Sequence, residues 1–499
     1  MKVLMINSNL SIMPLPVFPY GLCMVSASLE KAGHKIYLLD LCFLKNVKQG
    51  IENTIKAFNP DIIGVTVRNI DAAARLNAFF QLEQVKSKVI DPLKQVFSGP
   101  IIIGGPAVGI SGAEILEYFD LEYAIIGDGE AAMVDFVQRI ENTKSLKGLK
   151  GLTRRKDGKI IEENEPWRIT ELNDLPLPDY RKYLELETYR RYKSTIQIQS
   201  KRGCALNCTY CTYKIIEGQK IRLRDPQLVA DEIEKIYKET GFEYFEFTDS
   251  AFNVPLGHSK AVLRAIIAKK LNIKMRTMGL VPSAIDEEYV DLLKQAHFEE
   301  VELGIESGND EMLQALGKNF NSKAIFRAAE LLGNVNIPAK WYLILGAPGE
   351  TMDTLKETFE TVKKAISPWD FIVVFNGIRT YKGAAISEQF KKEKPHCTDD
   401  NFLRPVFYEP KSISLDDIST VSYRMMLKYL PNVVIPERRQ NISNIVLKIQ
   451  NLIIRLFCPQ LPWWKFYIFT NKVKKILGIN FMKRKILEFK NPQLFKEIK

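Results

Sequence analysis

Short apolar runs alternate with longer helical stretches over residues 1–150, which is the pattern of βαβ units around a parallel sheet. Each apolar run ends at a loop of small or polar residues, and ligands of open parallel sheets bind beyond the carboxyl ends of the strands. We therefore expect a doubly wound, Rossmann-type domain with a ligand site along one edge of its sheet. The expected strands are residues 2–6, 35–40, 62–66, 100–103 and 123–126.

The same alternation resumes at residue 196 and continues to residue 390, with six apolar runs separated by helical stretches. Six βα units in tandem predict an open, partial (β/α)6 barrel whose active site lies at the C-terminal ends of its strands. The expected barrel strands are residues 196–201, 244–248, 274–278, 300–305, 339–345 and 371–378.

Charged turns and the extended run LPLPDY fill residues 151–195, which is typical of a linker laid across a domain surface. The chain is thus expected to be an α/β protein with four parts. These are a doubly wound parallel-sheet domain over 1–150, a linker over 151–195, a partial barrel over 196–390 and a helical, basic C-terminal region over 391–499.

Composition supports this division and limits the class of protein. A chain of 499 residues fits two to four domains, and 46% apolar with 26% charged residues is the composition of a soluble globular protein. The first 16 residues are broken by asparagines and prolines, so they indicate a strand and a loop instead of a signal peptide. The sequence contains no unbroken run of 18 apolar residues, so no transmembrane helix is predicted. We expect a cytoplasmic protein in a reducing, low-oxygen setting.

Basic charge is concentrated at the C-terminal end of the chain. The formal net charge is +11, and residues 440–499 supply +10 of it through 12 lysines and arginines against two glutamates. Apolar positions at helical spacing and aromatic residues such as Trp463 and Trp464 accompany these charges, as in helices that lie on anionic lipid. Two interpretations stay open, namely contact with the inner face of a membrane and a helical cap packed on the barrel. Nucleic-acid binding is disfavoured, because no recognised RNA-binding module accompanies the basic segment.

The run GCALNCTYC places Cys204, Cys208 and Cys211 at a C-x3-C-x2-C spacing, in the loop after the first expected barrel strand. Three thiolates this close together can ligate three irons of a [4Fe–4S] cluster, and with no fourth cysteine nearby one iron is left open. A zinc site is disfavoured because it takes four ligands with paired spacing. A disulfide is disfavoured because short cysteine spacing in an intracellular chain indicates metal or redox chemistry.

This run, with the aromatic Tyr210 before its third cysteine, resembles the cluster motif of the radical S-adenosylmethionine (SAM) superfamily. Three further stretches at expected strand ends support the resemblance over residues 195–390: FTDSAFN, ELGIESGNDEMLQALGK and LILGAPGET. The resemblance implies that the cysteines hold a [4Fe–4S] cluster, that its open iron binds SAM, and that SAM is cleaved to a 5′-deoxyadenosyl radical. The SAM contacts that it implies are Tyr210 beside the cluster, Thr248, Asp249 and Ser250 for the amino group, Arg276 for the carboxylate, Glu306 and Ser307 for the ribose or carboxylate, and Leu345 beside adenine.

Taken singly, these positions have structural alternatives. An aspartate in a strand-end turn, such as Asp249, is commonly the N-cap of the next helix. Paired glycines are commonly tight turns. The convergence of the motifs on the edge that carries the cysteines favours the functional interpretation.

The first half resembles the cobalamin-binding domain that precedes the radical SAM domain in one large subclass, through PYGLCMVSASLEKAGHKIYLLD, VTVRN, IIIGGPA and AIIGDGEAA. Glycines without a Cβ would let a corrin face approach the backbone closely. The histidine motif D-x-H-x-x-G is absent, since His34 is the only histidine of residues 1–150, so we expect the lower face of cobalamin to be open or water-bound. A relic domain without the cofactor is the alternative. The implied contacts are Asn7, Ser8, Thr66, Arg68, Gly104, Gly105, Gly127, Asp128 and Glu130.

The resemblance implies an enzyme that uses a [4Fe–4S] cluster, SAM and cobalamin to methylate an unactivated carbon. Its partners would be a small-molecule or lipid-like substrate and a reductase or flavodoxin-type electron donor. A non-methylating radical enzyme, such as a cyclase, an oxidase or a rearrangement catalyst, is the runner-up. From another class, a membrane-docked scaffold with a degenerate core is the third interpretation, which the intact cysteine run disfavours.

Overall fold

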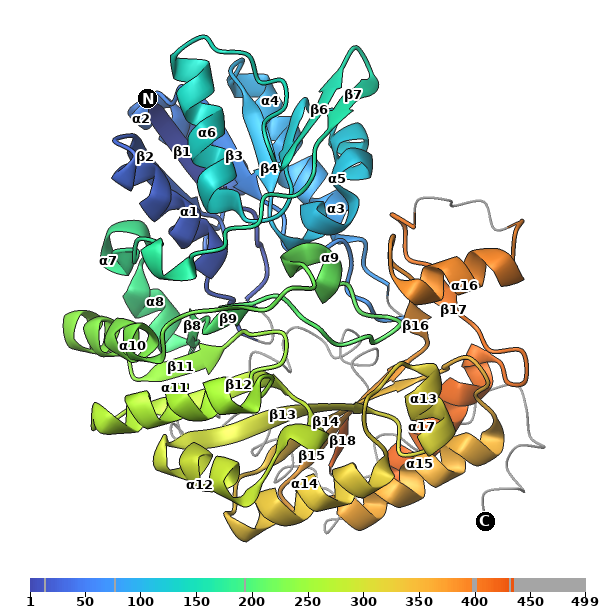
Figure 1. The fold of residues 1–499 in the computed structure, drawn as a ribbon. Helices are drawn as coiled ribbons and strands as arrows, with labels where there is room; N and C mark the ends of the chain where they lie inside the picture. The colour runs from blue at the N-terminus through green and yellow to red at the C-terminus, as the bar shows by residue number, and fades with distance from the viewer. Residues whose placement is uncertain (13–14, 76–77, 193, 397–401, 430–431, 435–499) are drawn as a thin grey trace.

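The computed structural model describes residues 1–434, apart from residues 13–14, 76–77, 193, 397–401 and 430–431. Within this part, the chain forms two seven-stranded sheets with helices, so the predicted α/β fold class is confirmed. The N-terminal half lies over the open side of the C-terminal half (Figure 1). The predictions for residues 440–499 lie outside the described residues.

The first sheet has the strand order β2-β1-β3-β4-β5-β6-β7, and its first five strands are parallel. Alternate side chains of β1 point to opposite faces of the sheet, into two separate buried layers. Val3 and Met5 share a core with α1 and α6, whereas Leu4 and Ile6 share another with α2, α4 and α5, so the domain is doubly wound. The elements are β1 (Lys2–Asn7), α1 (Tyr20–Lys31), β2 (Lys35–Asp40), α2 (Val47–Phe58), β3 (Ile62–Thr66), α3 (Gln81–Val85), η1 (Lys86–Ile90), α4 (Asp91–Val96), β4 (Ile101–Gly104), α5 (Pro106–Phe119), β5 (Tyr123–Ile125) and α6 (Gly129–Glu141).

An antiparallel hairpin extends this sheet into the segment predicted as a linker. β6 (Leu152–Lys156) pairs with β5, and β7 (Lys159–Glu163) pairs with β6. The turn between them is Asp157–Gly158, both at positive φ, which is the dipeptide that tight hairpin turns prefer. The hydrophobic pattern in the sequence of this hairpin is weak, because β7 is a charged edge strand that buries no residue. We propose that the first domain ends at residue 163 and not at residue 150.

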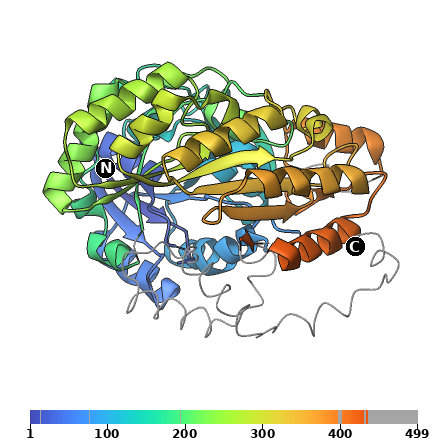
Figure 2. The same ribbon diagram turned by 90° about the horizontal axis from the view of Figure 1, so that it is seen from below.

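The second sheet has the order β18-β15-β14-β13-β12-β11-β8, with every strand parallel to its neighbours. Most of its helices cover the outer face, and its inner face is turned toward the first domain (Figures 1 and 2). The strands are β8 (Ile196–Ile198), β11 (Tyr244–Phe247), β12 (Lys274–Leu280), β13 (Phe298–Glu306), β14 (Ala339–Leu345), β15 (Phe371–Asn376) and β18 (Val433–Val434). The helices are α10 (Pro226–Thr240), α11 (Leu256–Ala268), α12 (Glu287–Gln295), α13 (Asp310–Ala315), α14 (Ser322–Asn334), α15 (Met352–Ala365), α16 (Ala385–Glu393) and α17 (Leu415–Tyr429).

The six predicted barrel strands are joined by β18, a seventh that the hydrophobic pattern misses because it is only two residues long. In the described residues, no helix combines the length and the apolar character that crossing a membrane requires.

The two halves share one hydrophobic core across the remainder of the predicted linker. Tyr180, Tyr183 and Tyr189, in α7 (Tyr180–Tyr183) and α8 (Leu186–Arg191), belong to a buried cluster that also contains residues of α1 and of the barrel strands. The Tyr189 hydroxyl donates to the Asp40 carboxylate at 2.7 Å. The part of the predicted linker that forms α7 and α8 therefore packs into the interior and is not a free spacer.

A buried ion pair joins the first domain to the C-terminal part of the chain, and we expect it to matter for stability. The Arg379 Nε–Asp71 Oδ2 distance is 2.8 Å, and both side chains are almost completely buried. Asp71→Ala leaves this guanidinium without its carboxylate, which should lower the free energy of unfolding by about 3 kcal/mol. Urea unfolding measures this, with the exposed pair of Lys356 and Asp353 as control. Asp353→Ala should cost less than about 1 kcal/mol.

Candidate cofactor sites between the two domains

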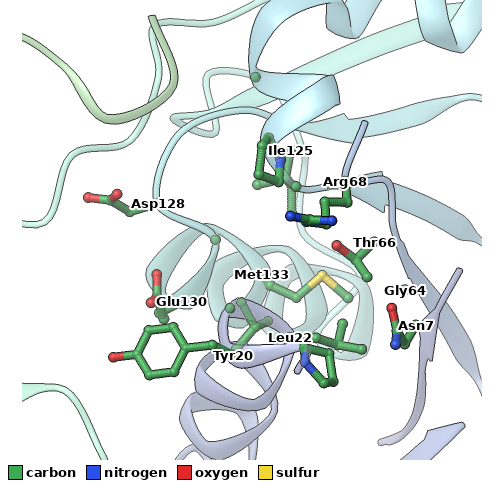
Figure 3. Close-up of a pocket in the computed structure, with 18 of the residues that line it drawn as sticks. Asn7, Tyr20, Leu22, Gly64, Thr66, Arg68, Ile125, Asp128, Glu130 and Met133 are labelled. Carbon is green, nitrogen blue, oxygen red and sulfur yellow. The ribbon is translucent and has the colours of Figure 1, made fainter. Parts of the chain in front are cut away.

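A cavity of about 310 Å³ lies where the carboxyl edge of the first sheet meets the start of the barrel. Figure 3 shows it in close-up, with Asn7, Thr66 and Arg68 among the labelled residues that line it. The barrel contributes residues of β8 and of the short helix α9 (Tyr213–Glu217) to its wall. Of the residues predicted to contact cobalamin, eight line the cavity: Asn7, Thr66, Arg68, Gly104, Gly105, Gly127, Asp128 and Glu130. Ser8 does not, and its hydroxyl donates to the Thr66 carbonyl instead.

The two glycines at the end of β4 act in different ways. A Cβ built on Gly104 would meet only the Ile125 carbonyl, at 3.7 Å, so the space beside Gly104 is open to a ligand. Gly105 has a φ of +100°, and a Cβ there would lie 2.7 Å from Thr66 Oγ1 and 2.8 Å from the Val67 carbonyl. Gly105 is therefore required by the packing of the β3 and β4 loops, whereas Gly104 fits the predicted approach of a corrin face.

Arg68 brings a cation into the cavity. Its side chain points into the open space in Figure 3. The residue is exposed to solvent, but protein atoms surround much of it and displace water. This desolvation lowers the pKa of Arg68, while Tyr213 and Glu246 oppose the effect. Arginine keeps its charge in such surroundings, so the cavity presents a positive group to whatever occupies it.

Asp128 and Glu130 line the cavity, but their carboxylates are engaged by arginines of the barrel. Glu130 binds Arg202 through both oxygens, at 2.5 and 3.2 Å, and Asp128 pairs with Arg202 at 3.3 Å and with Arg222. Burial alone would lower the pKa of Arg202, but Glu130 and Asp128 outweigh it and raise that pKa. These carboxylates therefore join the two domains, and their direct contact with a cofactor stays a prediction.

The three cysteines lie on one loop between β9 (Lys201–Arg202) and α9. The base of the loop is closed by β9 and β10 (Arg222–Leu223), which pair antiparallel, and by a hydrogen bond from the Cys204 amide to the Gly218 carbonyl at 3.0 Å. Burial raises the pKa of Cys211 to about 12, and the neighbouring thiols of Cys208 and Cys204 contribute to this rise. The three thiols therefore lie within electrostatic reach of one another.

The donor set of this loop fits a cluster better than a single ion. In the described part of the chain, no three His, Cys, Asp or Glu side chains converge tightly enough to ligate one metal ion. Each thiolate of a [4Fe–4S] cluster binds its own iron, so the three sulfurs need not converge on a point. Free thiols spread along one partly buried loop match that requirement.

A buried triad lies beside the cysteine loop and includes a residue that the sequence pattern did not indicate. Lys318 Nζ donates to Glu306 Oε1 at 3.1 Å and to the Tyr210 hydroxyl at 3.0 Å, and Tyr210 donates to Glu306 at 2.8 Å. Burial lowers the pKa of Lys318, but Glu306 and the Cys208 thiol raise it more. Glu306 adopts a φ of +64°, a strained conformation for a residue with a side chain. The triad thus holds one cation and one anion beside the cysteine loop.

The residues at the end of β11 hold the entry of the cysteine loop. The Asp249 carboxylate is buried and accepts hydrogen bonds from the Ser200 amide at 2.9 Å, the Ser200 hydroxyl at 2.6 Å and the Lys201 amide at 3.2 Å. Ser250 donates to the Gly203 carbonyl at 3.3 Å, and Thr248 donates to the Ile198 carbonyl at 3.4 Å. The Asp249 carboxylate is therefore occupied by the backbone and side chain before the loop, which departs from the predicted contact with the SAM amino group.

Arg276 lies on the inner wall of the barrel among carboxylates. Its Nε is 2.8 Å from Glu246 and its Nη1 is 3.6 Å from Glu300, which is also paired with Lys340. Glu246 and Glu300 raise the pKa of Arg276 against the effect of burial. The charge of Arg276 is thus already neutralised by protein carboxylates, whereas the prediction gave Arg276 the SAM carboxylate as its partner.

Two further predicted contacts are packed into the protein. The Ser307 hydroxyl is buried, 2.8 Å from Thr358 Oγ1, and accepts a hydrogen bond from the Asn309 amide. Leu345 is completely buried in the main core. Side chains alternate along a strand, so Ile344, which packs against the same small cluster as Tyr210, lies on the opposite face from Leu345. The predictions of ribose and adenine contacts for these two residues are not supported by their positions.

Comparisons with known proteins match this arrangement. The family model of the radical SAM superfamily matches residues 198–362, and that of the B12 binding domain matches residues 13–137. A tryptophan 2-C-methyltransferase from Streptomyces laurentii is 25% identical over 422 residues, covering 71% of this chain and 69% of the relative. An anaerobic magnesium-protoporphyrin IX monomethyl ester cyclase from Synechocystis sp. is 26% identical over 329 residues, covering 64% and 62%.

A solved structure resembles most of the chain. It is the radical SAM methyltransferase TsrM from Kitasatospora setae, with cobalamin and a [4Fe–4S] cluster bound. It has a TM-score of 0.82 and 18% identity, and the match covers 96% of this chain and 99% of that one. At this identity the likeness establishes the fold.

The two halves therefore define a radical SAM domain preceded by a B12-binding domain, and the resemblance found in the sequence is confirmed. The chain belongs to the radical SAM superfamily, in the subclass with an N-terminal B12-binding domain. It is an enzyme, and the predicted cofactors, a [4Fe–4S] cluster, SAM and cobalamin, are those of its two domains.

Proposed function

We propose that this enzyme transfers a methyl group to an unactivated carbon of a small molecule, with cobalamin as the carrier of the methyl group. The observation that carries the proposal is the position of α9. This helix begins two residues after Cys211, and its last two residues line the cavity of the B12-binding domain. A cluster on the cysteine loop and cobalamin in the cavity would therefore lie on the two sides of one short helix.

The residues that would hold the cofactors follow from their chemistry. Cys204, Cys208 and Cys211 would ligate the cluster. Lys318 would offer a cation to the carboxylate of SAM, and Glu306 would offer an anion to its amino group. The cavity beside Gly104 would hold the corrin. When bound, the cluster with SAM supplies one-electron cleavage of SAM, and cobalamin supplies a transferable methyl group.

The residues of the chain contribute positioning and exclusion of water. Tyr210 is fixed by Glu306 and Lys318, so the loop between Cys208 and Cys211 is tied to the end of β13. The Thr209 amide donates to the Leu316 carbonyl at 3.0 Å and ties the same loop to the end of α13. Such prior ordering is what the alignment of two cofactors and a substrate requires.

The proposed partners are a small-molecule substrate, as for the tryptophan methyltransferase relative, and a reductase or flavodoxin-type electron donor. Contact of residues 440–499 with a membrane surface remains a prediction, because these residues lie outside the described part of the chain. A non-methylating radical reaction is the second candidate, which the likeness to the ester cyclase favours.

Anaerobic reconstitution tests the proposal. The protein is supplied with iron, sulfide and hydroxocobalamin, and visible spectra are recorded before dithionite and SAM are added. Bound cobalamin, about four irons per chain, and formation of both 5′-deoxyadenosine and S-adenosylhomocysteine are expected. A cluster and 5′-deoxyadenosine without bound cobalamin would contradict methyl transfer through that cofactor and favour the second candidate.

A further inference from the structure

We propose that Glu217 is a positioning residue that couples the two cofactor sites, so that a cluster on the cysteine loop strengthens the binding of cobalamin in the cavity. The inference rests on the proposed use of cobalamin and goes beyond it. It concerns the energetic link between the sites, which neither the fold nor the comparisons assign.

Helix α9 forms a wall shared by the two sites. Ile216 and Glu217 line the cavity, whereas Tyr213, at the other end of the helix, lies within electrostatic reach of the Cys211 and Cys204 thiols. The helix is held from outside as well, because Arg168 donates to the Ile215 carbonyl at 2.7 Å and also to that of Ile216. Because α9 directly follows the cysteine loop and its end lines the cavity, a displacement of the loop would move the cavity wall.

The Glu217 carboxylate joins the end of the cysteine loop to its beginning. One oxygen accepts a hydrogen bond from the Gly203 amide at 3.1 Å, and the other accepts one from Gln199 at 3.3 Å. Gly203 immediately precedes Cys204, has a φ of +93°, and would carry a Cβ only 2.2 Å from the Lys220 carbonyl. The backbone around Gly203 thus has little freedom to move, and Glu217 fixes the first cysteine relative to the cavity.

The burial of Glu217 explains why this contact should be specific. Burial raises the pKa of the Glu217 carboxyl, and the hydrogen bond from Gly203 opposes the rise. A carboxylate in such surroundings is costly unless its hydrogen bonds are made. The Glu217 carboxylate is therefore most stable when the cysteine loop has the conformation in which the Gly203 amide donates to it.

A second attachment ties the cavity wall to the same loop. Arg202, two residues before Cys204, binds Glu130 at 2.5 Å, and both residues line the cavity. Both ends of the cysteine loop are thus attached to the surface on which cobalamin would lie. A cluster orders the loop between these attachments, and the ordering that it supplies need not be supplied again when cobalamin binds.

The test compares the affinity for hydroxocobalamin with and without the cluster. Anaerobic titrations followed by visible absorbance give the Kd for the reconstituted protein and for the protein before reconstitution. Couplings between sites typically change affinity by about 5- to 150-fold, so we expect the wild-type ratio of the two Kd values to exceed about 5. Reciprocity requires that cobalamin also raise the affinity for the cluster by the same factor, which competition with an iron chelator at equilibrium measures.

Three variants separate coupling from simple contact. Glu217→Ala should bring the ratio of Kd values close to one, and Glu217→Gln should restore part of it because an amide oxygen can still accept from Gly203. Gln197→Ala is the matched control, since Gln197 lines the cavity from β8 without a hydrogen bond to the cysteine loop among the described contacts. This control should weaken both affinities equally and leave the ratio unchanged.

A wild-type ratio near one, or an unchanged ratio in Glu217→Ala, would overturn the inference. If neither form of the protein binds hydroxocobalamin, the proposed function fails and the coupling with it. If the ratio behaves as expected but no S-adenosylhomocysteine is formed, the coupling stands and methyl transfer fails.

Discussion

Exchange of Cys208 for alanine is expected to remove the iron–sulfur cluster and, with it, all reductive cleavage of SAM. The loop offers three thiolates for three irons, so the loss of one leaves two of the four irons without a protein ligand. Loss of a partner that only supports a metal ligand already costs about 10- to 100-fold in metal affinity, and loss of the ligand itself costs more. Iron analysis after reconstitution should fall from about four irons per chain to a small fraction of that.

The control for this variant is Cys23→Ala. Cys23 is a free, completely buried thiol on α1, outside the cysteine loop. Its replacement should leave the iron content and the formation of 5′-deoxyadenosine unchanged. Normal iron content in Cys208→Ala would show that the loop does not ligate the cluster.

Replacement of Lys318 by methionine should weaken SAM binding by about 10- to 100-fold while leaving the iron content intact. A hydrogen bond to a charged group contributes about 1.5–3 kcal/mol, and Lys318 is the cation of the triad beside the cysteines. Methionine also leaves Glu306 buried without its ion pair, and Glu306 is the group that we propose for the SAM amino group. Equilibrium binding of SAM to the reconstituted protein measures the effect.

Two further variants make this second prediction specific. Lys318→Arg keeps the charge and should restore most of the affinity. Lys356→Met, in an exposed ion pair on α15, should have no effect. Equal affinity of Lys318→Met and the wild type would exclude Lys318 from SAM binding.

The sequence predicted the features that depend on local spacing. The three cysteines lie within eight residues, so their chemistry can be recognised without the fold, and the strand-end glycines and polar residues lie at the predicted edge. Alternation also placed most strands. It failed where charged edge strands such as β7 bury nothing, and where β18 is too short to show a pattern.

The contacts that shape the site depend on distant parts of the chain and were missed or assigned differently. Lys318 meets Tyr210 across 108 residues, and Arg202 meets Glu130 across 72. A lysine after a glycine twelve residues beyond Glu306 was the available signal for Lys318, but one sequence gives no reason to select it. Asp128, Asp249 and Arg276 have the expected chemistry, yet the fold uses their charges within the protein.

The single core that runs from α1 through Tyr180 and Tyr189 into the barrel has a consequence for the catalytic cycle. Domains joined through a large hydrophobic interface do not swing apart, because separation would expose that interface to water. Substrate entry and the exit of spent SAM fragments are therefore expected to proceed through movements of loops at the rim, while the two halves keep a constant separation. Reactive species would then form beside an interface between the two domains that stays closed throughout turnover.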